Sequence, residues 1–162
     1  MVSKKRDEGK LFEKDIKDSI PREFFVERYK DDTAGFRGVA NPADFRLYNY
    51  PYTFLWELKT HRGKSIPLSM IRSSQLKGMN KARSYVGVCC GFLLNYRDLE
   101  ETYYVGFDNL IAWFYTLTVK GEFEPKGRKS IPVEWCRKYG LRIPQQRKIK
   151  RYSYDLWSLL GG

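Results

Sequence analysis

Residues 41–60 read NPADFRLYNYPYTFLWELKT, and this stretch decides the fold. Two runs of β-favouring residues flank a turn-like Asn-Tyr-Pro-Tyr tetrad, so we expect a β-hairpin between Asp44 and Lys59. If the turn is centred on the bond before its proline, Asp44 and Glu57 are equidistant from that centre and lie opposite each other. Because side chains alternate along a strand, Glu57 and Lys59 then share one face with Asp44.

The opposed carboxylates indicate a metal site. Paired hairpin positions hold their Cβ atoms about 4.5–5.5 Å apart, and like charges there are destabilising. Asp44 and Glu57 therefore require a counter-charge, and Mg²⁺ or Mn²⁺ with hard oxygen ligands would satisfy both. Lys59 would point at the same spot and steady a phosphate oxygen or a water, as in metal-assisted phosphodiester cleavage. The alternative is that Glu-Leu-Lys forms the solvated face of an ordinary amphipathic strand.

The placement of charge favours a nucleic-acid partner. The chain has 162 residues, enough for one domain with a proper core, and a formal net charge of +11. Residues 60–85 carry six Lys or Arg and no acid, and residues 120–151 carry eleven against three acids. Two basic segments around a locally acidic centre resemble a DNA-binding surface around a metal site. The alternative, generic solubility, is usually achieved with mixed signs.

Several functional classes are excluded or disfavoured by the sequence. No apolar run is long enough to span a membrane, and the N-terminus lacks the apolar segment of a secretory signal. The three cysteines have no metal-ligand spacing, and an odd count is typical of reduced thiols. With His61 as the single histidine, zinc sites and Ser-His-Asp triads are disfavoured. We expect a cytoplasmic protein.

Two segments predict helices near the hairpin. Residues 8–20 place apolar side chains at i, i+4 and i+8, and Glu13 borders that stripe, where a carboxylate is ordinarily solvated but is able to reach inward. Residues 69–83 follow the hairpin, and Gln75 falls within their apolar face. A buried amide needs partners, and here they would be the metal water or the scissile phosphate. The alternative for Gln75 is a partly exposed margin of the helix.

The rest of the chain alternates buried strands with polar connections. We expect a strand over 24–30, a continuous central strand over 85–95, and another strand over 102–107. Asp108 would cap a helix that extends to Leu117, and the chain from Lys120 would be loop-like. A short helix over 133–139 and an amphipathic helix over 154–160 would follow. The residues that we expect to contact DNA are Arg28, Arg37, Arg62, Lys64, Arg72, Lys77, Arg128, Lys129 and Ser130. For Arg28 and Arg37, pairing with the acids at 31–32 is the alternative.

The order of these features resembles the PD-(D/E)xK nuclease superfamily. Within it, the chain looks most like the RecU family of Holliday junction resolvases, particularly its phage and prophage relatives. The matching stretches are Gly9-Lys-Leu-Phe-Glu13, Asp44-Phe45 with Glu57-Leu-Lys-Thr60, Lys64-Ser-Ile-Pro-Leu68 followed by Gln75 and Met79, and Gly127-Arg-Lys-Ser-Ile131. One departure is the proline of the motif, because Pro42 precedes Asp44 by two residues. Another is the family's protruding stalk, since the interval 24–39 is brief.

The resemblance implies an α/β fold with a mixed central sheet flanked by helices and a restriction-endonuclease-like core. It implies a single nuclease domain over 1–162 with a basic DNA-binding segment at about 120–151. It also implies a homodimer that grips a four-way DNA junction and nicks two strands symmetrically using Mg²⁺, in a bacterial cell and of phage or prophage type. By position, Asp44 and Glu57 would ligate the metal and Glu13 would complete the acidic cluster. Lys59 would polarise the attacking water, and Gln75 would orient Lys59 or that water.

Two other functions fit the same residues. One is another nuclease of this superfamily, of restriction or repair type, which cuts duplex DNA. The other is a non-catalytic DNA-binding module in which the acids are structural. Cleavage of a four-way junction compared with its linear arms separates the first from a resolvase, and the absence of any metal-dependent nicking identifies the second.

Overall fold

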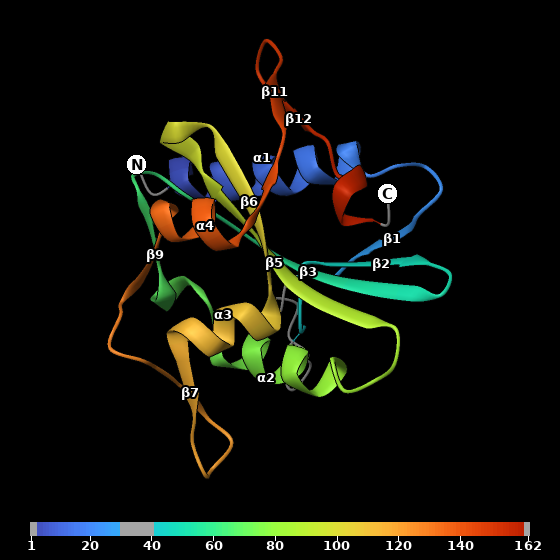
Figure 1. The fold of residues 1–162 in the computed structure, drawn as a ribbon. Coiled ribbons are helices and arrows are strands. Elements are labelled where there is room, and N and C mark those ends of the chain that lie inside the picture. The colour runs from blue at the N-terminus through green and yellow to red at the C-terminus, as the bar shows by residue number, and fades with distance from the viewer. Residues whose placement is uncertain (1–2, 30–40, 161–162) are drawn as a thin grey trace.

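A six-stranded mixed sheet forms the centre of the protein (Figure 1). The structure, a computed structural model, describes residues 3–29 and 41–160. Strand order is β1-β2-β3-β5-β6-β10, with β3 and β5 parallel and every other neighbouring pair antiparallel. The sheet strands are Phe25–Arg28 (β1), Phe45–Asn49 (β2), Tyr52–His61 (β3), Val88–Tyr96 (β5), Glu101–Gly106 (β6) and Leu141–Ile143 (β10). The mixed central sheet expected from the sequence is confirmed.

Helices cover both faces of this sheet. The α-helices are Ser3–Ser19 (α1), Ser73–Ala82 (α2), Phe107–Phe114 (α3) and Val133–Tyr139 (α4), and the 3₁₀ turns are Leu68–Met70 (η1), Arg97–Leu99 (η2) and Trp157–Leu159 (η3). Figure 1 shows α1 on one side of the sheet and α2 with α3 on the other. One apolar core joins α1 and the C-terminal residues to the sheet, and a second joins α2, α3 and α4 to it.

The side-chain alternation of β3 links the two cores. Phe54, Trp56 and Leu58 pack toward α1, whereas Leu55 packs toward α2. Glu57 therefore also points toward α2, because it lies two residues beyond Leu55. β5 is buried over most of its length, as a central strand covered on both faces must be. The continuous apolar run over 85–95 thus has the position that its composition predicts.

The β2–β3 hairpin is closed by Tyr50 and Pro51, which are joined by a cis peptide bond. The start of β5 packs tightly against this turn. Gly87 has a φ of +83°, and a Cβ atom there would lie 2.8 Å from the carbonyl oxygen of Pro51. Position 87 thus requires glycine, because its φ is positive and because a Cβ atom would clash with the Pro51 carbonyl oxygen.

Three short two-stranded sheets extend the body. They pair Ser65–Pro67 (β4) with Ser130–Pro132 (β9), Tyr115–Leu117 (β7) with Phe123–Pro125 (β8), and Gln145–Arg147 (β11) with Tyr152–Tyr154 (β12). The β7 and β11–β12 hairpins project at opposite ends of the view in Figure 1. The loop-like structure expected from Lys120 is therefore only partly correct, because β8 and β9 pair with strands that precede them in the chain.

Three further sequence predictions are wrong in their details. The helix expected to reach Leu117 ends at Phe114, and the chain turns at once into β7. Asp108 does not cap that helix, because Gly106 is its N-cap and the Asp108 carboxylate is paired with Arg83. The amphipathic helix expected over 154–160 is instead the end of β12 followed by η3. In the described part of the chain, no helix is long and apolar enough to cross a membrane.

Candidate active site

The β2–β3 hairpin brings two carboxylates close together where β2 begins. Its register runs from Asn49 paired with Tyr52 to Phe45 paired with Trp56, and Asp44 and Glu57 are the next residues beyond that last pair. The Asp44 N–H donates to the Trp56 carbonyl oxygen (3.0 Å), one residue out of step with that register, so Asp44 lies at a bulge where β2 begins. The register predicted from the turn position is confirmed as far as the pair of Phe45 and Trp56, and Asp44 lies beside Glu57, close enough for their charges to interact.

Glu57 is buried on the α2 side of the sheet, with two donors on one of its oxygens. Glu57 Oε1 accepts a hydrogen bond from Gln75 Nε2 (2.6 Å) and lies 2.8 Å from Lys59 Nζ. The amide of Gln75 is held at its other end, because its Oε1 accepts the N–H of Arg72 (2.9 Å). Gln75 is only 2% exposed, so the sequence alternative of a partly exposed margin is wrong. Its contact is with Glu57, and any influence of Gln75 on Lys59 passes through that carboxylate.

Asp44 has an unusual electrostatic environment for a carboxyl group. Its Oδ2 accepts the N–H of Leu58 (2.8 Å). Burial, and next the charge of Glu57, raise the pKa of Asp44 to about 7, against the opposing effects of the Leu58 hydrogen bond, Lys59 and Arg28. Burial also raises the pKa of Glu57, although Lys59 and Gln75 oppose that shift. Both acids are thus costly to ionise, and for Asp44 the charge of Glu57 adds to that cost.

These two residues fit a divalent cation. Among the described residues, Asp44 Oδ1 and Glu57 Oε2 accept no hydrogen bond, whereas the other oxygen of each group is held by protein donors. Two hard oxygens, one on the half-buried Asp44 and one on the buried Glu57, are the donor set that Mg²⁺ and Mn²⁺ prefer. A cation would offset the burial that raises both pKa values and the Glu57 charge that raises the pKa of Asp44.

Glu13 does not join this pair in the structure. It lies on α1, which packs on the opposite side of the sheet from Glu57. Its Oε2 forms an ion pair with Nη2 of Arg28 at 2.6 Å. Within residues 3–29 and 41–160, no group of three or more His, Cys, Asp or Glu side chains could hold a metal ion. The expected three-acid cluster is therefore not assembled, and a metal-binding role for Glu13 stays a prediction.

Comparison with known proteins places this hairpin in a family. A family profile described as "RecU: Recombination protein U" matches residues 43–154, which is more than half of the chain. The matched range contains Asp44, Glu57, Lys59 and Gln75. The chain belongs to the RecU family. The resemblance seen in the sequence is thereby confirmed.

Individual RecU relatives match over different shares of their length. The SPbeta prophage-derived uncharacterized protein YotM of Bacillus subtilis (strain 168) is 31% identical over 166 residues, which covers 95% of this chain and 85% of that protein. The Holliday junction resolvase RecU of Streptococcus pneumoniae serotype 19F (strain G54) is 28% identical over 116 residues, covering 72% of this chain. The match spans about half of that resolvase (54%).

A weaker likeness exists among solved structures. The structure described as Hjc from Archaeoglobus fulgidus, a Holliday junction resolvase from an archaeal hyperthermophile, has a TM-score of 0.46 and 14% sequence identity. The likeness covers 88% of this chain and 95% of the archaeal chain.

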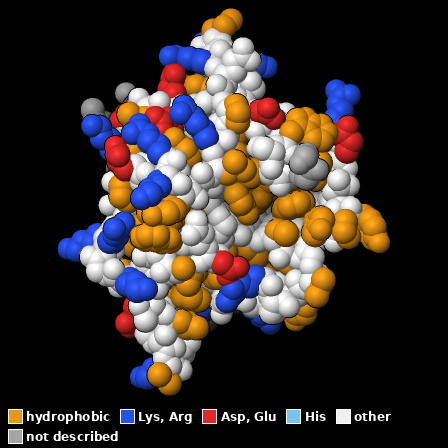
Figure 2. All heavy atoms as spheres, viewed as in Figure 1, with side chains coloured by type: hydrophobic (Ala, Val, Ile, Leu, Met, Phe, Trp, Pro, Cys, Tyr) orange, Lys and Arg blue, Asp and Glu red, His pale blue; other side chains and the backbone are white. Residues whose placement is uncertain are grey.

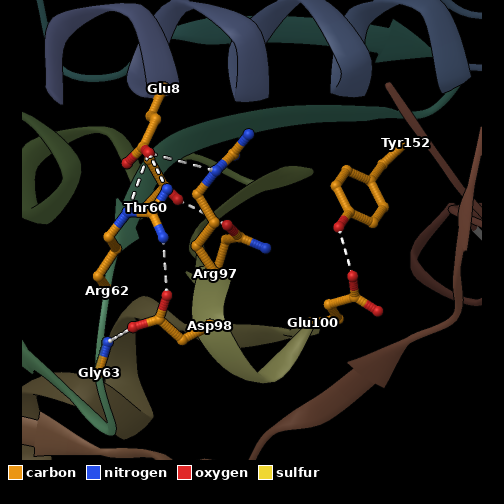
Figure 3. Close-up of polar contacts among 9 residues, drawn as sticks. Glu8, Thr60, Arg62, Gly63, Arg97, Asp98, Glu100 and Tyr152 are labelled. Atoms are coloured by element: carbon orange, nitrogen blue, oxygen red, sulfur yellow. Dashed lines mark hydrogen bonds and ion pairs between the residues drawn. The ribbon is translucent and has the colours of Figure 1, made fainter. Parts of the chain in front are cut away.

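Some of the cations predicted to bind DNA are held by acids of this RecU-family chain itself. Arg62 donates to Glu8 of α1 (Nε–Oε1, 3.0 Å) and to Asp98 of η2 (Nη1–Oδ1, 2.9 Å), and Figure 3 shows its guanidinium lying between these carboxylates. Lys77 is similarly paired with Glu122. Arg62 and Lys77 thus join parts of the fold, which weakens their assignment as free phosphate contacts.

Other predicted DNA contacts line a separate cleft beside α2. Arg128 and Lys129 border a largely apolar cleft of about 530 Å³, and the Arg128 guanidinium lies 5.8 Å from the centre of the Phe114 ring. Ser130 begins β9 next to it, and the Lys64 carbonyl accepts the N–H of Val133 at the other end of that strand pair. Figure 2 shows Lys and Arg side chains gathered mainly on the left half of the face in view. Arg37 lies outside the described residues.

The sequence interpretation missed a second basic cleft, about 430 Å³ in volume, beside α1. It is lined by Lys10, Glu13, Lys14, Lys17, Asp18, Arg28 and Phe45. The signal was present as three lysines at i, i+4 and i+7 within residues 8–20, but that helix was interpreted only through its apolar stripe.

Proposed function

We propose that this protein is a metal-dependent DNA endonuclease that resolves four-way junctions by paired, symmetric nicks. The observation that carries the proposal is the pair of the half-buried Asp44 and the buried Glu57 with Lys59 at its side, in a chain of the RecU family. Relatives that carry the name Holliday junction resolvase support the junction as substrate. The basic segments of the chain support DNA as partner.

Asp44 and Glu57 would hold the cation, which we propose to be Mg²⁺ with Mn²⁺ as a substitute. Glu13 would complete the acidic cluster. When bound, the cation supplies Lewis-acid activation of water and neutralises charge that develops on the phosphodiester. The two acids suit a cation because burial, and for Asp44 the nearby Glu57, make their negative charges costly when no cation is bound.

Lys59 and Gln75 would prepare the site around those acids. The Lys59 ammonium, held 2.8 Å from Glu57 and mostly shielded from solvent, is placed to polarise the attacking water or to contact a phosphate oxygen. Gln75 acts as a positioning residue: its 2.6 Å hydrogen bond fixes the Glu57 carboxylate, and the Arg72 N–H fixes Gln75.

Symmetric nicking of a junction requires two such sites facing opposite strands, so we propose a homodimer. Residues 1–162 would form one nuclease domain, with the basic segment at about 120–151 contributing to the DNA-binding surface. The proposed site of action is the cytoplasm of a bacterial cell, with a phage or prophage origin in keeping with the similarity to YotM.

The test measures nicking of a four-way junction and of its linear arms at equal concentration with Mg²⁺. We expect the junction to be cut in preference to the arms, and Asp44→Asn to reduce the rate about 1000-fold, since the cation contributes several kcal/mol. Asparagine keeps an oxygen for the Leu58 N–H, so the fold should persist. Equal rates on both substrates would identify a nuclease of restriction or repair type, and DNA binding without nicking would identify a binding module.

A further inference from the structure

The cleft beside α1 has a composition that distinguishes it from the rest of the surface. Its basic side chains include Lys10, Lys14 and Lys17. The two acids in its lining are already paired, Glu13 with Arg28 at 2.6 Å and Asp18 with Arg151 at 2.8 Å. Among the described residues, the three lysines have no acidic partner, so the cleft keeps an uncompensated positive charge.

The spacing of the lysines suits a nucleic-acid backbone. At 1.5 Å per residue, Lys10 and Lys17 are separated by about 10 Å along the helix axis. Phosphates of one DNA strand advance about 3.4 Å per nucleotide along a duplex, so this row spans about three successive phosphates. All three side chains are exposed on α1, which is anchored by its buried Phe12 and Ile16. A rigid helix therefore presents three cations in a row.

The position of the cleft connects it to the candidate active site. Phe45 in its lining directly follows Asp44 in the chain, and β1 ends at Arg28, which pairs with Phe45 in the sheet. Arg28 is close enough to Asp44 to act on its charge. The cleft lies on the α1 face of the sheet and Glu57 on the α2 face, so a DNA strand that leaves the cleft around the β1 edge would pass the start of β2, where the two carboxylates lie.

We propose that this cleft is a phosphate-backbone site that holds the DNA strand next to the point of cleavage, with Lys10, Lys14 and Lys17 as its contacts. The inference rests on the proposed function, because it names how the substrate is held at the same site. It adds a second binding surface to the Arg128–Lys129 segment, from a helix that the family match does not include.

The test compares two triple variants with the same net charge. The cleft variant carries Lys10→Gln, Lys14→Gln and Lys17→Gln. The control carries Arg46→Gln, Lys81→Gln and Arg83→Gln, which are exposed cations outside both the cleft lining and the basic segment at 120–151. Binding of a four-way junction and of a linear duplex is measured against salt concentration with EDTA present, so that cleavage does not interfere. Thermal unfolding of both variants checks the fold.

We expect the cleft variant to lower the slope of log K against log salt by about 2–3 units, one unit or slightly less for each lost phosphate contact. The control should change that slope by less than about one unit. Equal slopes for the two variants, or a wild type that binds neither probe, would overturn the proposal. A wild type that binds with the expected slopes but nicks nothing would leave the cleft in place and refute the nuclease function.

Discussion

Two carboxylate sites on the same sheet are built in opposite ways. Glu101, at the start of β6, accepts two hydrogen bonds from Arg137 (2.7 and 3.0 Å) and one from Tyr103 (2.6 Å). The Arg137 bonds in particular lower the pKa of Glu101 to about 2. Asp44 instead has a pKa raised to about 7 by burial and by Glu57. A chain with thirty Lys and Arg residues had cations available, yet the hairpin acids are left under-compensated.

This difference in pKa separates a carboxylate that stabilises the fold from a pair that is suited to bind a cation. A carboxylate that stabilises the fold is hydrogen-bonded by two guanidinium nitrogens of an arginine, as Glu101 is by Arg137. A pair of acids that repel each other lowers stability until a cation arrives, and such a cost is expected at functional sites. The following predictions test whether this contrast is real.

The largest difference should appear when one acid of each site is neutralised and the nicking rates of the two variants are compared. Glu57→Gln should reduce Mg²⁺-dependent nicking of a four-way junction about 1000-fold, because it removes a proposed metal ligand. Glu101→Gln should leave nicking within about threefold of wild type. Both rates are measured under single-turnover conditions. Similar losses in the two variants would show that the hairpin acids have no special role.

The two sites should also give opposite dependences of stability on pH. The pKa of Asp44 is higher in the folded state than in the unfolded chain, so its contribution to stability is lost as pH rises from about 4 to 7, by at most about 4 kcal/mol. The pKa of Glu101 is lowered, so its contribution is present above about pH 4.5 and is lost as pH falls toward 2.

Urea unfolding between pH 3 and 8, without divalent cations, measures both dependences. Asp44→Asn should flatten the decline between pH 4 and 7, and Glu101→Gln should flatten the loss below pH 4.5. Unchanged curves in Asp44→Asn would mean that the hairpin acids do not oppose each other.

A smaller effect is expected from the buried amide that holds Glu57. Gln75→Leu removes the 2.6 Å hydrogen bond and should lower Mn²⁺ affinity and nicking about tenfold. The matched control is Asn95→Leu, because Asn95 is an equally buried amide, bonded to Thr60 and Thr102. Both variants should lose about 1–3 kcal/mol of stability. If the control lowered Mn²⁺ affinity as much, the effect of Gln75 would be merely structural.

The smallest effect concerns single cations at the surface. Arg128→Ala and Lys129→Ala should each flatten the salt dependence of junction binding by about one unit. Arg62→Ala should flatten it less, because Glu8 and Asp98 already neutralise that guanidinium. Fluorescence anisotropy across a salt series measures all three. If Arg62→Ala changed the salt dependence as much as Arg128→Ala and Lys129→Ala do, the ion pairs of Arg62 with Glu8 and Asp98 would have to break when DNA binds.

The features predicted correctly from the sequence depend on local rules. The nearness of Asp44 and Glu57 follows from the position of a turn and from side-chain alternation, and both are properties of one hairpin. Gln75 is conspicuous because it interrupts an apolar helical face. The prediction of helix 133–139 matches α4 in its bounds.

The failures depend on where distant segments pack. The sequence does not reveal that α1 packs on the far side of the sheet, which separates Glu13 from Glu57. Nor does it show that Arg28 takes the Glu13 carboxylate. The β4–β9 pairing joins segments more than sixty residues apart, and the region after Lys120 lacks any local signal for it. The amphipathic spacing of the last residues suits a helix, but pairing of Tyr154 with Gln145 makes part of it a strand.

The most direct test of the account is calorimetric titration of Mn²⁺ into the wild type, Asp44→Asn and Glu101→Gln at pH 7.5 without DNA. The account predicts binding by the wild type, affinity within about twofold for Glu101→Gln, and a loss of at least about tenfold for Asp44→Asn. An Asp44→Asn protein that binds Mn²⁺ as tightly as the wild type would contradict it.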